Sequence, residues 1–302
     1  VKMNQIRAEL DASHAQLLTI LNSPAFPVVI SDLETGLILF INERAAELFG
    51  FMLQEVGRYR ETNFWYRAGD RQAFLAQIQQ NERVDSFEAR LCRADQQTFW
   101  SLISGLKIHY EAQDAVLFSF SDISSQIERV KDLHLLATRD ELTGLFNRRA
   151  FFDQARAAIA KVPAAYPAVA ILMLDIDHFK QINDRFGHAR GDIVLRTVAH
   201  LCQQHFEQQG LVGRIGGEEF AAILLEANPD KVFFRAEQLR QAIAQTEIHT
   251  PSGDIHITMS IGMAMATADD TLDAALEQAD IALYQAKTNG RNRVERFITT
   301  PI

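Results

Sequence analysis

The fold is decided by the stretch Arg214-Ile215-Gly216-Gly217-Glu218-Glu219-Phe220. Its two adjacent glycines release the backbone for a tight turn. Phe220 then opens an apolar run to Leu225, which is typical of a buried strand. The pattern predicts a β-hairpin with Glu218 and Glu219 at its tip. Because adjacent carboxylates repel one another, this arrangement suits a divalent cation held between them and a substrate. The alternative is a charged surface hairpin.

The composition is that of an ordinary globular protein, with 302 residues, 47% hydrophobic and 23% charged. This length accommodates two domains. The net charge of -9 argues against DNA as a partner, because phosphate backbones need a basic face, but it leaves room for one phosphorylated small molecule. The two cysteines, Cys92 and Cys202, are too few for a disulfide framework or a four-thiolate metal site. We therefore expect a cytoplasmic protein.

No apolar run approaches the length of a membrane span, and the start of the chain does not resemble a signal peptide. We therefore expect no membrane span in this chain. The sequence begins at Val1, so a preceding segment, and membrane attachment through it, stays open.

The first part of the chain indicates a helix followed by a small α+β domain. Residues 1–21 repeat apolar side chains at three- and four-residue steps, which predicts an amphipathic helix. Residues 22–125 predict a single sheet that, with its helices, encloses an apolar pocket. The predicted elements are a strand from Val28, a turn at Gly36, a strand to Ile41, a helix over 42–49, a helix near 70–80, and strands over Ser86–Cys92, Thr98–His109 and Ala115–Ser121.

This order of elements resembles a PAS sensor domain over residues 22–125. No cysteine stands in the helical region 42–80, where a flavin-adduct photosensor needs one, and the predicted sensor helices contain no histidine. Light sensing through a flavin adduct and gas sensing through haem are therefore both disfavoured. The ligand of this domain, and the sign of its signal, stay open.

A second helix is predicted over 123–137, and we assign residues 126–138 to a helical linker. Its residues Ile123, Ile127, Val130, His134 and Ala137 recur at alternating four- and three-residue steps, the pattern of a short two-stranded coiled coil. The alternative is that this stripe docks on a neighbouring domain. We prefer a linker that joins two copies of the chain.

Residues 139–302 alternate helix and strand, which predicts an α/β domain with helices packed on a central sheet. The predicted elements are a helix after Asn147, a strand over Ala168–Ile176, a helix from Asp192 to about Gln208, a helix over about 229–246, a strand over Ile255–Met265, a helix over Leu272–Thr288 and a short strand over Val294–Ile298.

A carboxylate pair follows the most apolar of these strands. The run Val169–Leu174 is apolar throughout and leads directly into Asp175-Ile176-Asp177. A carboxylate at the end of a buried strand, facing the acidic hairpin, predicts a magnesium site with two carboxylate ligands. Oxygen ligands without thiols favour magnesium or manganese over zinc. We assign the metal to Asp175 and expect Asp177 only to cap the following turn.

Two further groups suit a nucleotide. Asn183 both accepts and donates hydrogen bonds and Asp192 accepts them, which fits the N1–H and exocyclic amine of guanine. Asp192 is alternatively the N-cap of the next helix. Lys287 and Arg291 suit a polyphosphate, although the same two cations also complement a helix dipole. The chain has no P-loop motif, so it must hold any nucleotide in another way.

Together these segments resemble the GGDEF family of diguanylate cyclases over about 139–300. The motifs that carry the resemblance are Asp140–Arg149, Asp175–Asp192, Gly216–Phe220, Ser260-Ile261-Gly262 and Ala279–Lys287. The resemblance implies a fold like that of nucleotidyl cyclase and polymerase palm domains. It also implies a nucleotidyltransferase that joins two GTP into cyclic di-GMP and releases two pyrophosphates. The whole chain is then a two-domain protein: a PAS-like antiparallel sheet domain, a helical linker and a GGDEF domain.

The resemblance also implies roles for individual residues. The magnesium or manganese ligands are Asp175, the Ile176 carbonyl, Glu218 and Glu219, and the residues with catalytic roles are Glu218, Glu219 and Lys180. Glu219 serves the second metal or deprotonates the 3′-hydroxyl. The groups that bind GTP are Asn183 and Asp192 at guanine, and the amides around Phe179 and Lys180 with the side chains of Lys180, Lys287 and Arg291 at the triphosphate. Because each domain holds one GTP, two domains must meet face to face, which makes a homodimer necessary for catalysis.

One departure from the family pattern concerns feedback. An Arg-x-x-Asp sequence forms the product-inhibition site of the family, and Glu207-Gln208-Gln209-Gly210 stands in its place. We therefore expect no inhibitory product site. Two rival hypotheses are a degenerate domain that binds GTP or a partner without turnover, and a chain that is mainly a PAS dimerisation scaffold.

Overall fold

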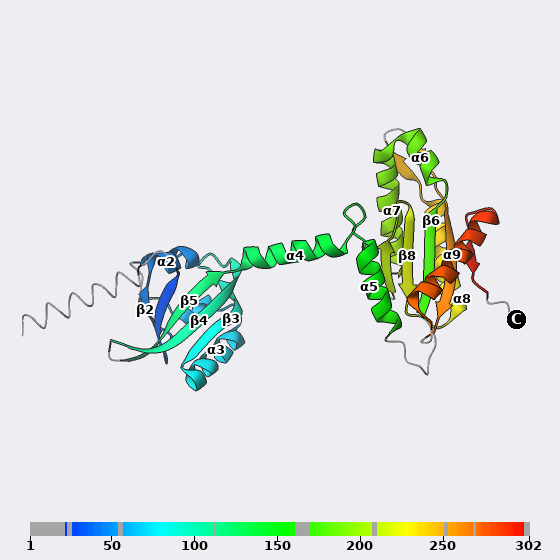
Figure 1. The fold of residues 1–302 in the computed structure, drawn as a ribbon. Coiled ribbons are helices and arrows are strands. Elements are labelled where there is room, and N and C mark those ends of the chain that lie inside the picture. The colour runs from blue at the N-terminus through cyan, green and yellow to red at the C-terminus, as the bar shows by residue number, and fades with distance from the viewer. Residues whose placement is uncertain are drawn as a thin grey trace, which may run out of the picture. The chain divides into compact units, whose positions relative to one another are not determined.

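The structure is a computed structural model that describes residues 22, 26–53, 57–111, 113–160, 169–206, 210–250, 253–267 and 270–298. The helix predicted over 1–21 lies outside these residues. The chain divides into two compact units, residues 1–131 and 132–302, and the division falls inside helix α4 (Ser124–Thr138). Each unit has a sheet of its own (Figure 1). Among the described residues, no helix combines the length and apolar character that a membrane crossing requires.

The first unit is built on one antiparallel sheet in the order β2-β1-β5-β4-β3. The predicted hairpin, helices and three-stranded run are confirmed, and the three long strands extend by one to three residues at some of their predicted ends. The strands are β1 (Val28–Asp32), β2 (Ile38–Ile41), β3 (Arg83–Cys92), β4 (Thr98–Tyr110) and β5 (Gln113–Asp122). The helices are α2 (Glu43–Phe49), the 3-10 turn η2 (Glu61–Phe64) and α3 (Ala68–Asn81).

Aromatic side chains fill the interior of this unit. The buried rings of Phe49 and Phe64 stack with their centroids 3.9 Å apart. Gly105 of β4 is needed where α3 crosses the strand, because a Cβ at this position would overlap the ring of Phe74. The apolar interior predicted for this unit is therefore lined by the protein's own phenylalanine rings.

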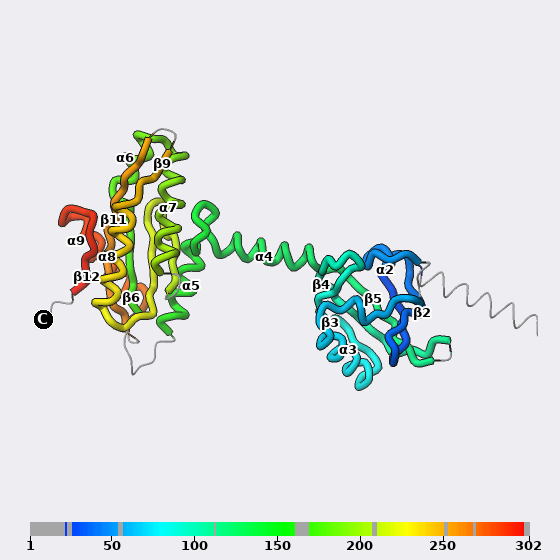
Figure 2. The backbone as a smooth tube through the Cα atoms, turned by 180° about the vertical axis from the view of Figure 1, so that it is seen from behind, coloured from blue at the N-terminus to red at the C-terminus, as the bar shows by residue number. Residues whose placement is uncertain are grey.

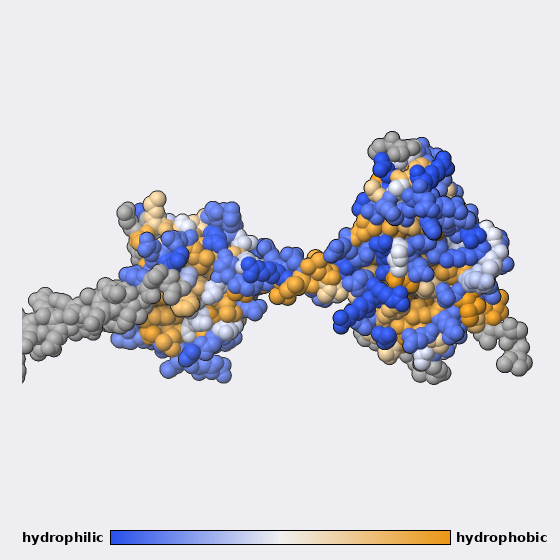
Figure 3. Space-filling view, turned by 45° about the horizontal axis from the view of Figure 1, so that its top comes forward, coloured by the Kyte–Doolittle hydropathy of each residue, from blue (hydrophilic) through white to orange (hydrophobic). Residues whose placement is uncertain are grey.

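Helix α4 buries none of its residues. Val130 is 66% exposed, Leu133 65% and Leu136 60%. Figure 3 shows orange, hydrophobic surface along this helix. Of the predicted stripe, Val130, His134 and Ala137 are exposed, whereas Ile123 and Ile127 are half-buried, and the exposed Leu133 and Leu136 do not belong to it. Contiguous exposed apolar side chains of this kind indicate a contact surface for a partner.

The second unit contains a five-stranded sheet in the order β12-β11-β6-β8-β7. Strand β6 lies in the middle and pairs antiparallel with β8 on one side and β11 on the other. The strands are β6 (Val169–Ile176), β7 (Gly210–Arg214), β8 (Glu219–Leu224), β11 (Met259–Ala266) and β12 (Val294–Arg296). A separate surface hairpin consists of β9 (Ile248–Thr250) and β10 (Gly253–Ile255).

Helices cover both faces of this sheet (Figures 1 and 2). Helices α5 (Arg148–Ile159) and α9 (Leu272–Thr288) pack on one face, while α7 (His188–Phe206) and α8 (Pro229–Gln245) pack on the other. Because side chains alternate along β6, Met173 faces α5 and α9, and Leu174 faces α7 and α8. Asp175 comes two residues after Met173 and therefore lies on the α9 side.

The structure corrects two predicted elements. The strand predicted over Ile255–Met265 is divided, because Ile255 belongs to the β9–β10 hairpin and β11 begins only at Met259. The helix predicted to begin at Asp192 begins at His188 instead. Gly187, with φ 85°, ends helix α6 (Phe179–Phe186), and α7 starts at the next residue. Asp192 therefore lies inside α7 and is not its N-cap.

Candidate active site

The acidic hairpin and the end of β6 come together as predicted. Asp175 and Glu219 are register partners across β6 and β8, and Ser260 is the partner of Asp175 on β11. The Ile176 N–H donates to the Glu218 carbonyl at 3.4 Å, so the end of β6 lies against the signature turn. Strands on both sides thus fix the position of the Asp175 backbone.

The turn itself brings Gly216 close to Glu219. A Cβ at Gly216 would lie 2.3 Å from Oε2 of Glu219, so a larger residue there would displace this carboxylate, whereas a Cβ at Gly217 would meet no atom within 4 Å. The Ile215 N–H donates to the Glu219 carbonyl at 2.9 Å, which closes the hairpin. Arg214 holds the turn from outside, because its Nη2 donates to the Gly217 carbonyl at 2.8 Å. The hairpin predicted from the sequence is confirmed, with Glu218 in the turn and Glu219 as the first residue of β8.

Arg214 also connects this turn to the segment around Asp140, which follows helix α4. Its Nη1 lies 3.1 Å from Oδ1 of Asp140, which also accepts the Thr143 N–H at 3.0 Å. Burial would raise the pKa of Asp140, but the hydrogen bonds from Thr143 and Arg214 outweigh burial and hold this pKa below its usual value. Sequence reasoning assigned Asp140 only to a motif and missed this ion pair, because no local pattern links residues 74 positions apart.

The carboxylates at the end of β6 and in the turn resist ionisation. Burial, and then the charges of Glu219 and Asp177, raise the pKa of Asp175, although Lys287 acts in the opposite direction. Burial and the charge of Asp175 likewise raise the pKa of Glu218. The site thus concentrates more negative charge than its own cation neutralises. An added divalent cation would relieve this repulsion, and oxygen donors suit magnesium or manganese.

Lys287 is the cation nearest to these carboxylates. It lies in the last turn of α9, and its Nζ is 2.8 Å from Oδ2 of Asp175. Gly262 of β11 lets α9 approach the sheet, because a Cβ there would overlap backbone atoms of Ala279 and Leu283. The sequence predicted a phosphate contact for Lys287. In the structure this side chain contacts Asp175, so it must exchange partners to reach a phosphate.

The start of α6 offers free backbone donors. His178 adopts a left-handed conformation with φ 59° and precedes Phe179 and Lys180, the first two residues of α6. The first N–H groups of a helix have no partner within the helix and favour anions. Phe179 is buried, while the Lys180 side chain is exposed. This is the place that the sequence assigned to the triphosphate.

The predicted guanine contacts lie where α6 meets α7. The Asn183 Oδ1 atom is buried and has no hydrogen-bond partner among the described residues. Gly191 makes room for this oxygen, because a Cβ at Gly191 would overlap it. Asp192 is the next residue on α7 and is partly exposed. A buried acceptor without a partner is costly unless a ligand donates to it, and the N–H edge of guanine supplies such donors.

Asp177 departs from its predicted role. It is 4% exposed and does not cap the turn that follows it. Its carboxylate instead accepts hydrogen bonds from Thr258 Oγ1 at 2.6 Å, from Ser260 Oγ at 2.7 Å and from the Asn292 N–H at 3.0 Å. Two of these donors lie more than 80 residues away and the third 115 away, which is why local turn chemistry did not reveal them.

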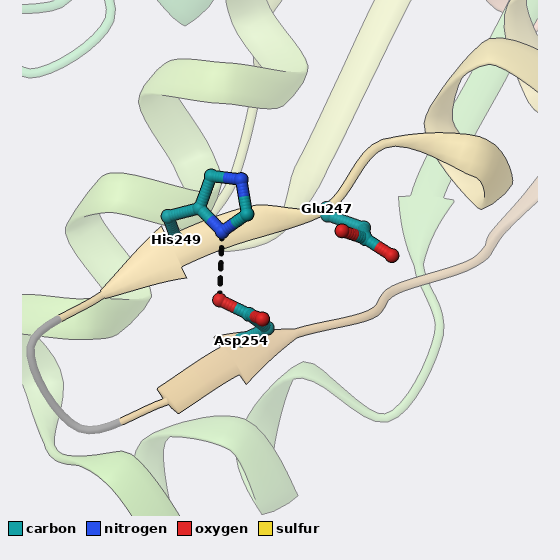
Figure 4. A group of neighbouring side chains, drawn as sticks. All are labelled: Glu247, His249 and Asp254. Carbon is teal, nitrogen blue, oxygen red and sulfur yellow. Dashed lines mark hydrogen bonds and ion pairs between the residues drawn. The ribbon is translucent and has the colours of Figure 1, made fainter.

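Two other features bear on the site. Residues Glu207–Gln209 lie outside the described residues, and Gly210 begins β7, so the missing inhibitory site stays a prediction. Glu247, His249 and Asp254 cluster on the β9–β10 hairpin (Figure 4). All three are exposed, and His249 pairs with Asp254 directly across the strands at 2.7 Å. A surface ion pair accounts for this cluster.

Comparison with known proteins agrees with this geometry. Residues 137–293 match the family described as diguanylate cyclase, GGDEF domain, and residues 26–125 match a PAS domain. A diguanylate cyclase of Vibrio cholerae is 36% identical over 173 residues, which cover 57% of this chain and 54% of that protein. Diguanylate cyclase DgcM of Escherichia coli is also 36% identical over 173 residues, which are 57% of this chain and 42% of DgcM. The chain thus spans about half or less of the length of these relatives.

A solved structure shows the same catalytic fold. It comprises the coiled coil and GGDEF domain of DgcB from Caulobacter crescentus in complex with c-di-GMP, with 33% identity and a TM-score of 0.55. The match covers 58% of this chain and 93% of that one. The predicted fold class, a PAS antiparallel sheet unit followed by a GGDEF unit, is confirmed.

Proposed function

The chain belongs to the GGDEF-domain family of diguanylate cyclases, and we propose that it condenses two GTP into cyclic di-GMP with release of two pyrophosphates. The observation that carries the proposal is the meeting of Asp175 with the signature turn. Strand register sets Asp175 opposite Glu219, the turn holds Glu218 beside them, and the pKa values of Asp175 and Glu218 are both raised.

These residues fit magnesium or manganese. The ligands would be the Asp175 carboxylate, the Ile176 carbonyl and Glu218, with Glu219 serving a second ion, and all of these donors are oxygen atoms. When bound, the metal would lower the pKa of the 3′-hydroxyl and neutralise charge on the phosphates. The alternative role for Glu219, which lies at the start of β8 directly across from Asp175, is to accept the proton of that hydroxyl.

The remaining residues bind and orient GTP. The unpartnered Oδ1 of Asn183, together with Asp192, would accept from the N1–H and exocyclic amine of guanine. The N–H groups of Phe179 and Lys180 would hold the triphosphate at the start of α6. The cations that would neutralise its charge are the side chains of Lys180, Lys287 and Arg291. Lys287 would leave Asp175 for the phosphates when metal replaces it there.

The reaction requires two copies of the chain. Each catalytic unit offers one guanine site, so both 3′-hydroxyls react only when two loaded units face one another. The exposed apolar side chains of α4, which include Val130 and Leu133, support a parallel helix pair that holds the copies together. The PAS unit would regulate turnover through this helix. With two free cysteines, Cys92 and Cys202, and GTP as substrate, we place the protein in the cytoplasm.

The decisive experiment measures turnover of GTP with magnesium by the purified chain at several protein concentrations. Cyclic di-GMP should form, and the rate per monomer should rise as dimers form. Glu219→Ala should abolish the product without unfolding the protein, while Glu247→Ala, which removes an exposed glutamate of the β9–β10 hairpin, should leave turnover unchanged. GTP binding without any turnover by the parent chain would instead support the degenerate-domain hypothesis. A dimer that neither binds nor turns over GTP would support the scaffold hypothesis.

The proposed enzyme lacks feedback through Glu207–Gly210, since these residues replace the family's Arg-x-x-Asp site. Added cyclic di-GMP should therefore leave the initial rate unchanged at low concentration. Low-micromolar inhibition, with cyclic di-GMP bound at these four residues, would contradict this proposal.

A further inference from the structure

Asp177 is a buried carboxylate that the proposed chemistry does not use. It is 4% exposed, and the three groups described as donating hydrogen bonds to it are all neutral. Oδ1 accepts from the Ser260 hydroxyl, and Oδ2 accepts from the Thr258 hydroxyl and from the Asn292 N–H. Burying a charged carboxylate is unfavourable unless hydrogen bonds compensate for the lost water. The three donors supply this compensation, and they occupy both oxygens.

The bond to Asn292 reaches a segment with an unusual backbone. Arg291 and Asn292 are consecutive residues in the left-handed region, with φ 61° and 46°. Residues other than glycine rarely adopt this conformation, and a pair of them persists only where surrounding contacts hold it. The described contacts at these two residues include the bond from the Asn292 N–H to the Asp177 carboxylate and the bond from the Arg291 N–H to the Ala286 carbonyl at 2.9 Å. Arg240 also donates to the Asn292 side chain at 2.7 Å, and Arg293 Nε donates to the Arg291 carbonyl at 3.4 Å.

Of these four contacts, only the one with Asp177 connects the segment to the end of β6. Asp177 follows Asp175 by two residues, and its own N–H donates to the Thr258 carbonyl at 3.0 Å. A carboxylate bound to a backbone N–H is a charge-assisted hydrogen bond, which is shorter and stronger than a neutral one. The hydrogen bond from Asn292 to Asp177 therefore links the backbone next to Arg291 to the end of β6, the strand that carries the proposed metal ligand Asp175.

We propose that Asp177 is a positioning residue that holds Arg291 at the triphosphate. This inference rests on the proposed function, which assigns Arg291 to the phosphates. Asp177 touches neither nucleotide nor metal. It fixes the left-handed backbone at 291–292, and this backbone sets where the Arg291 guanidinium reaches. Loss of the Asp177 charge should therefore weaken contacts to the phosphates and leave guanine recognition intact.

The test compares two ligands on the full chain in the presence of magnesium. One is 3′-deoxy-GTP, which has the triphosphate but lacks the attacking hydroxyl, and the other is GMP, which lacks the β- and γ-phosphates. Calorimetry gives both dissociation constants for the parent chain and for Asp177→Asn. We expect about tenfold weaker binding of 3′-deoxy-GTP, as loss of one charge-assisted contact predicts. The affinity for GMP should not change.

A double-mutant cycle with Arg291→Ala isolates the mechanism. If Asp177 acts through Arg291, then Asp177→Asn should cause no further loss of 3′-deoxy-GTP affinity once Arg291 is alanine. Fully additive losses, or an equal loss for GMP, would overturn the proposal. If Arg291→Ala itself leaves 3′-deoxy-GTP binding unchanged, the triphosphate assignment of Arg291 fails. If Arg291→Ala weakens 3′-deoxy-GTP binding and Asp177→Asn does not, only the positioning role of Asp177 is refuted.

A matched control separates positioning from general stability. Ser260→Ala removes another hydrogen bond to Asp177 but leaves the bond to the Asn292 N–H in place. It should lower the melting temperature and leave the ratio of the two dissociation constants unchanged. If Asp177→Asn does not fold, Asp177→Glu replaces it in the same binding test. Its extra methylene moves the carboxylate away from the Asn292 N–H, so the same selective loss is expected, and an unchanged ratio would refute the proposal.

Discussion

Lys287 should compete with metal for Asp175, so Lys287→Gln should strengthen metal binding and weaken GTP binding. In the structure, Lys287 Nζ lies 2.8 Å from the Asp175 carboxylate, whose side chain is only 9% exposed. A metal ion that uses this carboxylate must first displace the ammonium group. Glutamine keeps much of the side-chain volume and removes the charge. The two ligands should therefore respond to one substitution in opposite directions.

The size of the effect follows from the geometry of this pair. Hydrogen bonds to charged groups contribute about 1.5–3 kcal/mol net. The Lys287 side chain is 32% exposed, so the lower end of this range applies. Removing the competing contact should therefore strengthen binding of Mn²⁺ to the nucleotide-free protein about tenfold. Without metal, the variant should melt at a lower temperature than the parent, because Asp175 is left buried without its partner.

Titration of the nucleotide-free protein with Mn²⁺, followed by electron paramagnetic resonance, measures this affinity. Arg291→Gln is the matched control, because it removes a neighbouring positive charge that has no described contact with Asp175. Its Mn²⁺ affinity should change much less, while both variants should bind GTP more weakly. Unchanged or weaker Mn²⁺ binding by Lys287→Gln would refute the competition and, with it, the assignment of Asp175 as a metal ligand.

Three further predictions concern other parts of the chain. Glu218→Gln should abolish turnover. It should also stabilise the metal-free protein by less than about 1 kcal/mol in denaturant unfolding, because burial and the charge of Asp175 raise the pKa of Glu218 and so disfavour its charged form. A lower stability of this variant would contradict the prediction. Val130→Asp on α4 should reduce the rate per monomer and the dimer fraction in sedimentation; an unchanged dimer would exclude the helix pair. Asp140 has a lowered pKa, so its stabilising effect is present above its ordinary value of 3.8 and is lost as pH falls through the lower folded value. Asp140→Asn should therefore reduce the acid dependence of unfolding, and an identical acid profile would count against the Arg214 pair.

The elements that could be predicted from sequence are those whose signal is local. The uniformly apolar run of β6 and the double glycine before Glu218 identify a central strand and a hairpin, and the structure confirms both. The predicted start of α7 at Asp192 was wrong because a glycine followed by an aspartate, Gly191-Asp192, is typical of the residues that precede a helix. In the fold, Gly191 lies within the helix, where its lack of a side chain makes room for Asn183. Tertiary packing thus decided a boundary that local propensity had placed four residues later.

Within the candidate site, sequence reasoning selected residues that the fold brings close together, and it missed the contacts between them. It selected Asp175 and Lys287 separately, for metal and for phosphate, and could not foresee their ion pair. For Asp177 the predicted role itself was wrong, because its position just after a strand suggested that it caps the following turn. Its partners Thr258 and Asn292 come from distant segments that only the completed sheet and α9 bring to it. Long-range hydrogen bonds of this kind leave no periodic signal in the chain.

The central position of β6 restricts how a signal can act on the proposed enzyme. Asp175 is held between β8 and β11, so it cannot move without breaking pairing on one of its two sides. A sensor that controls the enzyme therefore has little power over how tightly one unit holds GTP. What it can change is the number of productive encounters per second between two loaded units. Regulation should then appear as a change in kcat at a constant KM.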